Sequence, residues 1–344
     1  MMTGAALFRL PYSNQCTFVS GEVFELSSYA ALSGHVGFVM APFALSDERP
    51  VSVIRPDCVR RFSMNDISGI SCFCSISGFS GPFSDNHREN YHIDFVNFHA
   101  HLMNGDFRKL VLSRCIDIPR TDDMSPMTLF LRACERYPRV FVSLVSTPCS
   151  GLWLAATPEI LLAGSGGDWQ TMALAGTMPY SNNVAWSDKN IQEQRYVATY
   201  ITEQLEQFTH HFIEEGPRTV RAGHLAHLRS DFHFSLNDNK IIGDLLQTLH
   251  PTPAVCGLPK HEAFRFILQN EHHNRSYYSG FMGPLFVDGQ TNLFVTLRCM
   301  QLFENSYRLY AGGGLLKESS EELEWQETET KLDTMRNVIY NYNV

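Results

Sequence analysis

Two carboxylates and one ammonium share a face of the helix that the C-terminal sequence predicts. Glu324, Glu327 and Lys331 stand at i, i+3 and i+7, so their side chains form one stripe. Just upstream, the run Gly312–Gly314 follows an alternating apolar segment, and glycines in a turn let main-chain amides approach a ligand closely. Carboxylates hold hard cations, while an ammonium and amides hold anions. The pattern therefore suggests a site for a metal-bound polyanion.

A plainer explanation of the same stretch stays open. Glu318, Glu321, Glu322 and Glu329 make it acidic throughout, and most acidic runs are solvated helix faces. The choice between the two explanations depends on what the rest of the chain brings to this helix.

Composition narrows the class of protein. The chain has 344 residues, 44% of them hydrophobic and 18% charged, so a large core is feasible and disorder is not expected. A net charge of −9 without a Lys/Arg cluster argues against nucleic acid and anionic membranes as partners. Nine scattered cysteines, no secretory leader and no long apolar run predict a cytoplasmic protein with reduced thiols.

Short elements follow one another along the chain. Alternation and turn residues predict successive strands at 140–145, 152–156, 160–163 and 171–175, which favours antiparallel pairing. The longest helical pattern spans 188–212, and single strands are predicted at 291–303 and 306–311. No linker rich in Pro, Gly or Ser interrupts the chain. We therefore expect one α+β unit, with large antiparallel β-sheets and helices packed around them.

Other residues with chemical potential stand at the ends of these elements. Lys109 opens a strand, Glu159 follows Pro158 in a turn, and Glu193 lies on the long helix. Taken singly, each has a structural explanation, since a strand-edge lysine discourages aggregation and a turn carboxylate is usually hydrated.

Six motifs taken together resemble the chorismate-binding enzymes, and among these most closely the isochorismate synthases. They occur in order between about Lys109 and Val338, two thirds of the chain, whereas residues 1–95 carry no part of the resemblance. The motifs are Leu110–Arg114 after Lys109, Ala156–Glu159, Leu174–Thr177, His250–Ala254, Thr296–Cys299 and Glu324–Lys331. The resemblance implies the fold of anthranilate synthase component I. It also implies a catalytic region at 96–344, with residues 1–95 integrated into the same domain.

The resemblance implies a role for each candidate residue. Lys109 matches the general base and Glu159 the general acid of a reaction that adds water to chorismate at C2 and expels its C4 hydroxyl. Glu193 and Glu327 match ligands of Mg²⁺, with Glu324 holding a metal-bound water. Without the cation, these carboxylates would repel one another. The positions implied to hold the substrate are Ala175, Gly176, Thr177, His250, Arg298, Gly312, Gly313, Gly314 and Lys331.

Four positions qualify this comparison. Asn190 and Gln194 depart from the family's usual Asp and His on either side of Glu193, which leaves the support of that carboxylate in question. Ala175 stands where related aminodeoxychorismate synthases carry a nucleophilic lysine, and thus leaves space for water. His250 fits either a substrate pocket or a hydrogen-bonded core position.

The leading interpretation is a Mg²⁺-dependent isochorismate synthase that acts on chorismate without an obligate protein partner. Salicylate synthase, which continues by losing pyruvate, is a second enzymatic reading, and anthranilate synthase component I is a third. Outside the enzymes, the alternative is a catalytically inactive chorismate-binding protein. The sequence leaves open whether the product serves menaquinone or a siderophore, because the chemistry is the same.

Overall fold

The structure is a computed structural model, which describes residues 2–64, 73, 87–121, 124–180, 185–222 and 225–340. Its described strands pair antiparallel in two sheets that share one long strand, β2 (Gln15–Leu26). The first sheet runs in the order β13 (Gly257–Leu258), β6 (Lys109–Pro119), β17 (Ser306–Leu315), β16 (Cys299–Leu302), β8 (Gly151–Thr157), β7 (Phe141–Thr147), β1 (Thr3–Arg9), β2 and β5 (Cys58–Ser63).

The second sheet begins at an edge strand and returns to the far half of β2. Its order is β11 (Phe212–Ala222), β12 (Leu225–Ser235), β10 (Asp168–Pro179), β9 (Ile160–Ser165), β15 (Thr291–Val295), β14 (Phe281–Leu285), β3 (Gly37–Ala41), β4 (Val51–Ile54) and β2. Strands from the first 64 residues thus pair with later strands in both sheets, β1 with β7 and β3 with β14.

The two sheets pack face to face over an aromatic core. Phe8 and Phe141 of the first sheet contact Phe38 and Phe294 of the second, with ring centroids 5.5 Å apart for Phe8–Phe38 and 4.3 Å for Phe141–Phe294. The neighbouring residue Leu7 belongs to the core on the opposite face of the first sheet. This alternation follows from the two-residue period of a strand, and it buries both faces.

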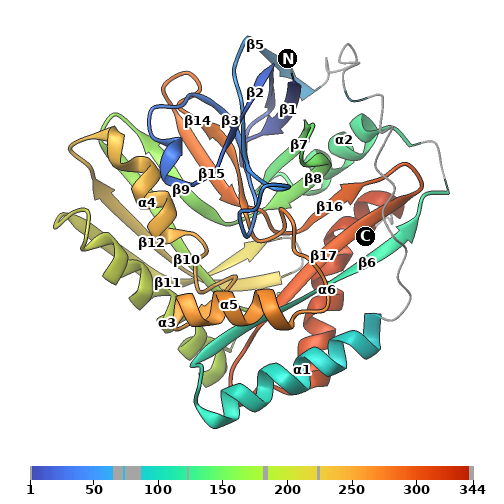
Figure 1. Ribbon diagram of the computed structural model, residues 1–344, viewed down its shortest axis with the longest axis vertical. Helices are drawn as coiled ribbons and strands as arrows, with labels where there is room; N and C mark the ends of the chain where they lie inside the picture. Colours follow the sequence, from blue (N-terminus) through green and yellow to red (C-terminus); the bar gives the residue numbers. More distant parts are fainter. Residues whose placement is uncertain are drawn as a thin grey trace.

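Helices cover the outer faces of the sheets (Figure 1). On the first sheet, α2 (Pro126–Arg136) and α6 (Glu321–Tyr340) pack over the apolar cluster that contains Leu7. On the second sheet lie α3 (Asp188–Leu205) and α4 (Ile242–Leu249). A third apolar cluster joins α1 (His87–Asn104) and α5 (Lys260–Asn270) to β6. Two short 3₁₀ turns lie at Ala30–Leu32 and Asn239–Ile241.

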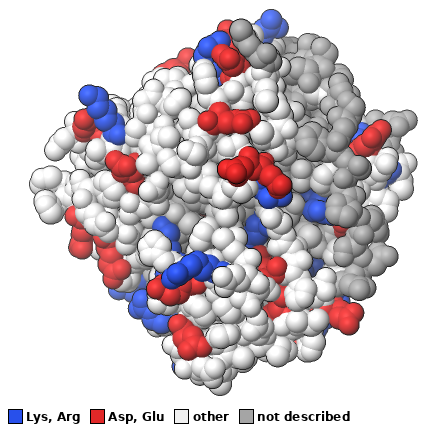
Figure 2. Space-filling view, in the orientation of Figure 1, with Lys and Arg blue, Asp and Glu red and all other residues white. Residues whose placement is uncertain are grey.

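This architecture confirms the predicted fold class, an α+β unit of large antiparallel sheets with helices around them. Within the described residues, no helix is both long and apolar enough to cross a lipid bilayer. On the face shown in Figure 2, basic and acidic side chains are interspersed rather than gathered in one patch.

Three predicted elements differ from the structure. The helix expected over 188–212 ends at Leu205, and Phe212 begins β11, a strand that the sequence did not reveal. β11 pairs only with β12 and carries exposed charged residues and Pro217, so its apolar alternation is faint. The strand expected over 291–303 is broken in two. The glycine run, expected as a turn, is the end of β17.

Candidate active site

The chain passes from one sheet to the other at Arg298, and this crossing forms one side of the candidate site. β15 belongs to the second sheet and β16 to the first, so the backbone must change direction between Val295 and Cys299. Arg298 makes the change with a left-handed φ of 45°, a conformation that costs energy for a residue with a side chain. Its guanidinium thereby enters the gap between the sheets.

A β-bulge in β10 forms the second side. The register of β10 with β12 shifts between Ala175 and Thr177, which leaves Gly176 as the extra residue with a φ of 68°. Gln194 of α3 holds this bulge, because its Oε1 accepts from the Ala175 amide at 2.9 Å and its Nε2 donates to the Ala173 carbonyl at 3.1 Å. Gln194, which stands where the family usually has a histidine, therefore supports β10 rather than Glu193.

The third side is the glycine end of β17. A Cβ at Gly314 would lie 2.1 Å from Oε1 of Glu193, and one at Gly312 would lie 2.7 Å from the Tyr278 hydroxyl. Only glycine permits these approaches. Gly312 and Gly314 pair with Ser113 and Val111 of β6.

The main-chain groups of Gly312 and Gly314 are not bonded to β6. Val111, which faces Gly314, does not donate its amide to β17 but to Cys256 O at 2.7 Å, on the opposite edge of β6. In an antiparallel pair, two facing residues that do not bond each other both point outward. The main-chain groups of Gly312 and Gly314 thus turn away from β6, and Gly312 O accepts from Lys331 Nζ at 2.8 Å.

These sides enclose a cavity of about 50 Å³. One water takes up about 30 Å³ of the liquid, so a ring-sized ligand enters only if the lining moves outward. Nine of the fourteen residues that the sequence singles out line the cavity, namely Glu159, Ala175, Gly176, Thr177, Glu193, Arg298, Gly312, Gly314 and Lys331. Lys109, Gly313, Glu324 and Glu327 lie directly behind them, as the contacts below show.

Burial gives Glu159 an unusual proton affinity. Its side chain is 2% exposed, and this burial raises its pKa to about 8, although Lys109, Arg298 and Lys331 oppose the shift. A carboxyl group of this kind keeps its proton at neutral pH and can donate it. Lys109, whose charge acts on Glu159, is completely buried behind the lining, at 0% exposure.

Each candidate metal ligand has a lysine partner. Lys109 Nζ lies 3.0 Å from Glu193 Oε1, Lys331 Nζ lies 2.6 Å from Glu327 Oε1, and Lys189 forms an ion pair with Glu324. The sequence-based expectation that these carboxylates face one another unscreened is wrong, because three ammonium groups neutralise them. Burial raises the pKa of Glu193, but Lys109 and Lys189 outweigh it, so the net shift is downward.

The carboxylates nonetheless lie against neighbouring residues of β17. A Cβ at Gly313 would lie 3.4 Å from Glu324 Oε2 and 3.7 Å from Glu327 Oε1, and Glu193 reaches the neighbouring Gly314. Glu324 Oε2 is buried without a hydrogen-bond partner. In the described ranges, no three His, Cys, Asp or Glu side chains lie close enough together to hold a metal ion as they stand. An open group of carboxylate oxygens still fits Mg²⁺, which keeps waters and takes oxygens from its substrate.

His227 is a cavity residue that the sequence did not point out. It lies on β12 beside the bulge of β10, where its Nδ1 is 3.1 Å from Gly176 O and its Nε2 is 3.3 Å from an Arg298 Nη. Burial and the two nearby cations lower its pKa to about 3, so the ring is neutral. A neutral ring that donates from Nδ1 accepts the Arg298 N–H at Nε2, which orients the guanidinium. The only hint in the sequence was a histidine on a predicted strand.

His250, in contrast, does not line the cavity. Its ring packs on Tyr29 and Phe281 at centroid distances of 4.7 and 5.1 Å, and its Nε2 lies 3.3 Å from Phe43 O. The assignment of His250 to the substrate pocket is therefore corrected to a core histidine. A larger cavity of about 710 Å³ lies near His210, His211 and His233, and none of the predicted site residues line it.

Comparisons with known proteins agree with this geometry. A family model described as "Chorismate binding enzyme" matches residues 82–340. Isochorismate synthase EntC of Escherichia coli (strain K12) is 32% identical over 241 residues, which cover 67% of this chain. The match covers 62% of EntC, so the chain spans less than two thirds of that relative's length. Isochorismate synthase DhbC of Bacillus subtilis (strain 168) is 30% identical over 359 residues, covering 94% of this chain and 86% of DhbC.

Two solved structures share the fold. MenF, the menaquinone-specific isochorismate synthase from Escherichia coli, superposes with a TM-score of 0.80 at 21% identity, covering 98% of this chain and 88% of MenF. Anthranilate synthase component I from Streptococcus pneumoniae superposes with a TM-score of 0.67 at 18% identity, covering 92% of this chain and 80% of that chain. At these identities, the superpositions demonstrate a common architecture.

Proposed function

Because the chain belongs to the chorismate-binding enzyme family, we propose that it is an isochorismate synthase, an isomerase that converts chorismate to isochorismate. The reaction adds water at C2 of the ring and expels the hydroxyl at C4. It requires a base for the water, an acid for the leaving hydroxyl and neutralisation of the substrate's carboxylates.

The observation that carries this proposal is that Lys109 and Glu159 are both buried and lie near enough for the lysine to lower the pKa of the carboxyl group. Glu159 is protonated at neutral pH because of its burial, so it is ready to protonate the leaving hydroxyl. We assign to Lys109 the removal of a proton from the incoming water, which requires that its ammonium group, now paired with Glu193, first lose its own proton. Neither side chain is exposed to bulk solvent, and the proton transfers are therefore confined to the cavity.

The substrate's carboxylates are matched by the cations on the opposite wall. Burial lowers the pKa of Arg298, because the guanidinium has lost water that the neighbouring groups replace only in part. A substrate carboxylate that accepts two hydrogen bonds from the guanidinium would replace this water. Lys331 and the outward-facing amide of Gly314 would serve a carboxylate in the same way.

We assign Glu193 and Glu327 as ligands of Mg²⁺ and Glu324 as the holder of one of its waters. When bound, the cation supplies positive charge to the carboxylate on the substrate's ring. Lys109, Lys189 and Lys331 each pair with one oxygen of these glutamates, so a bound cation would compete with the three ammonium groups for the carboxylates. Lys109 and Lys331 would then be available to the substrate.

Ala175 favours water as the nucleophile. It lies at the bulge with 6% exposure and carries no group that could attack C2 itself. A lysine at this position would place an amine where the water must stand.

Product analysis tests the proposal directly. The protein is incubated with chorismate and Mg²⁺, and the products are separated by chromatography. Isochorismate as the product supports the proposal. Salicylate with pyruvate would identify a salicylate synthase, anthranilate formed from ammonia would identify an anthranilate synthase, and chorismate binding without turnover would identify a binding protein.

A further inference from the structure

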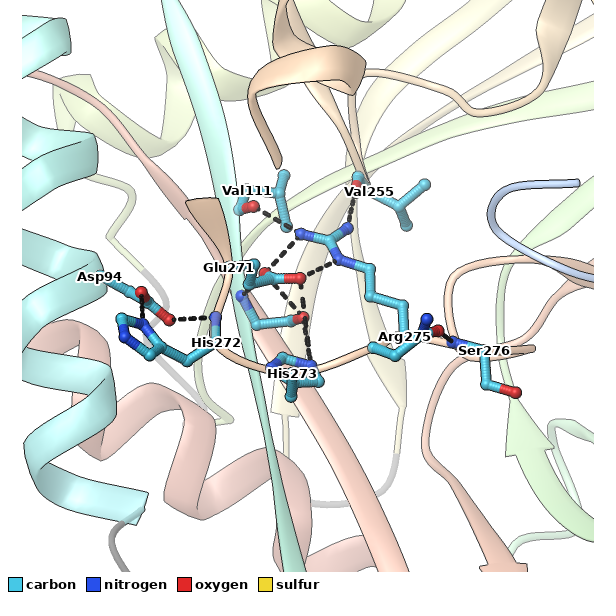
Figure 3. Close-up of polar contacts among 10 residues, drawn as sticks. Asp94, Val111, Val255, Glu271, His272, His273, Arg275 and Ser276 are labelled. Carbon is cyan, nitrogen blue, oxygen red and sulfur yellow. Dashed lines mark hydrogen bonds and ion pairs between the residues drawn. The ribbon is translucent and has the colours of Figure 1, made fainter. Parts of the chain in front are cut away.

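A fully buried ion pair lies behind the wall of the cavity, between α5 and β6 (Figure 3). Arg275 forms a two-pronged contact with Glu271, at 2.7 Å from Nε to Oε2 and 2.8 Å from Nη2 to Oε1. Both side chains are 2% exposed. The Arg275 plane also stacks over the Phe43 ring at 4.5 Å. Because the pair lies outside the cavity lining, the proposed reaction gives it no direct role.

The pair takes the place of a missing strand along one edge of β6. On the side away from β17, the short strand β13 pairs only with Lys109 and Leu110. Beyond this point, Arg275 Nη2 donates to Val111 O at 2.8 Å and Glu271 Oε1 accepts from the Ser113 amide at 2.7 Å. A side-chain donor and acceptor thus satisfy the backbone groups that a neighbouring strand would satisfy.

The same arginine ties β6 to two other walls of the cavity. Its Nη1 donates to Val255 O at 2.7 Å, and its own carbonyl accepts from the Tyr278 amide at 2.9 Å. Val111, Val255 and Tyr278 all line the cavity, and they come from three separate segments. Lys109 is two residues from Val111 on the same strand. A shift of the guanidinium would therefore move the general base and two walls relative to one another.

Stability alone does not explain such an arrangement well. A buried ion pair costs desolvation, and apolar residues of equal volume often stabilise a fold as much. An apolar pair could not bond Val111 O, Val255 O and the Ser113 amide at once.

We propose that Glu271 and Arg275 are positioning residues, which hold Val111, Val255 and Tyr278 in register around the reacting ligand. The role assigned to them rests on the proposed isochorismate synthase activity. Small displacements of the reacting groups lower the rate of the chemical step more than they lower the affinity for the substrate, because the reaction depends on alignment.

The test compares two charge pairs on β6, the fully buried Arg275–Glu271 pair and the partly buried Arg308–Asp117 pair. Arg275→Lys keeps the positive charge but cannot span Glu271, Val111 and Val255 together. Asp117→Asn is the matched control, because Asp117 accepts twice from Arg308 at 2.8 Å, farther along the same pair of strands and away from the cavity lining. Steady-state rates are measured well below the melting temperature of each variant, so that all are folded.

We expect Arg275→Lys to lower kcat by about 10- to 100-fold while KM changes by less than about threefold. Asp117→Asn should lower the melting temperature comparably and leave kcat within about twofold of wild type. An Arg275→Lys enzyme with wild-type kcat would overturn the inference. Absence of isochorismate from the wild-type enzyme would instead refute the proposed function.

A second measurement does not depend on turnover or on the stability of the lysine variant. Glu271→Met is close to glutamate in size and removes both acceptor oxygens, so neither Arg275 nor the Ser113 amide keeps its carboxylate partner. Hydrogen–deuterium exchange at the Ser113 amide should accelerate at least tenfold in this variant, on the order of one lost hydrogen bond. Exchange unchanged at Ser113 would show that the pair does not hold β6 and would also overturn the inference.

Discussion

Lys109 is the residue on which the proposed chemistry depends most. It is fully buried beside Glu193, at the start of a strand that both β17 and β13 hold in place. If it activates water, Lys109→Gln should lower turnover by roughly 10²- to 10⁴-fold, the usual contribution of a positioned base. Chorismate affinity, measured by calorimetry, should change far less.

The exposed lysine Lys317 offers a control for this substitution. Lys317→Gln should retain wild-type turnover. A Lys109→Gln enzyme that keeps more than about half of the wild-type rate would remove Lys109 from the mechanism, since a positioned base contributes far more.

Glu159 links activity to pH through its raised pKa. The carboxyl group titrates near 4.5 when hydrated and near 8 in the folded chain. Catalysis that needs its proton should therefore fall as the pH rises through about 8, and Glu159→Gln should lose this alkaline limb together with most activity. The pH–rate profile of kcat measures the effect.

The same shift also predicts that stability depends on pH. The folded state binds a proton that the unfolded state releases between pH 4.5 and about 8, so wild-type stability falls as the pH rises across this window. Glu159→Gln should be more stable than wild type above pH 8, by on the order of a few kcal/mol, and about equal to it below pH 4.5. Denaturant titrations at both pH values that give the same difference would contradict this assignment.

At the scale of elements, the bulge in β10 depends on Gln194. Gln194→Leu would leave Ala173 O and the Ala175 amide buried without their present partners, at a cost of about 1–3 kcal/mol for each unsatisfied group. We expect a lower melting temperature and a loss of turnover, since Ala175 borders the attacking water. Gln192→Leu, which changes an exposed glutamine of the same helix, should leave both unchanged.

Sequence patterns predicted most elements but not their interruptions. The strands predicted at 152–156 and 160–163 are confirmed as β8 and β9, because each is an apolar run between turn residues. The break at Arg298 was missed, since residues on both sides read as strand and only pairing with different sheets separates them. The glycine run read as a turn because glycine is rare inside strands, yet here its missing Cβ makes room for Glu193.

At the scale of the whole molecule, the site exists only where α3, α6 and both sheets meet. Glu193 and Glu327 come from the two helices, so their convergence is a tertiary property. The resemblance to the family predicted that Glu193 and Glu327 share one site. The spacing of residues in the sequence could not show that three lysines neutralise these carboxylates and Glu324. For the same reason His227 went unnoticed, because its partners Gly176 and Arg298 lie far away in the sequence.

This convergence predicts that metal and substrate bind together. Mg²⁺ would compete with the ammonium groups for the glutamates, and the substrate's carboxylates could accept from a lysine so released. Binding of either ligand should therefore increase the affinity for the other about 5- to 150-fold, the range typical of coupled sites. Calorimetric titration of chorismate with and without Mg²⁺ measures the coupling. Glu193→Gln or Glu327→Gln should lower the affinity for both Mg²⁺ and chorismate.

Glu329→Gln is the control for these substitutions. Glu329 lies on α6 but pairs with Arg114 and Arg336, so its loss should affect stability without changing the affinity for Mg²⁺. Equal chorismate affinity in both conditions, with activity unaffected by a chelator, would rule out the metal assignment.

The most direct test of the account follows oxygen from solvent into product. Chorismate is converted in water enriched in ¹⁸O, and the product is separated and analysed by mass spectrometry and NMR. The account predicts isochorismate with one solvent oxygen at C2, because Lys109 activates water while Glu159 releases the C4 hydroxyl. Isochorismate that retains the unlabelled oxygen, or a product other than isochorismate, would contradict it.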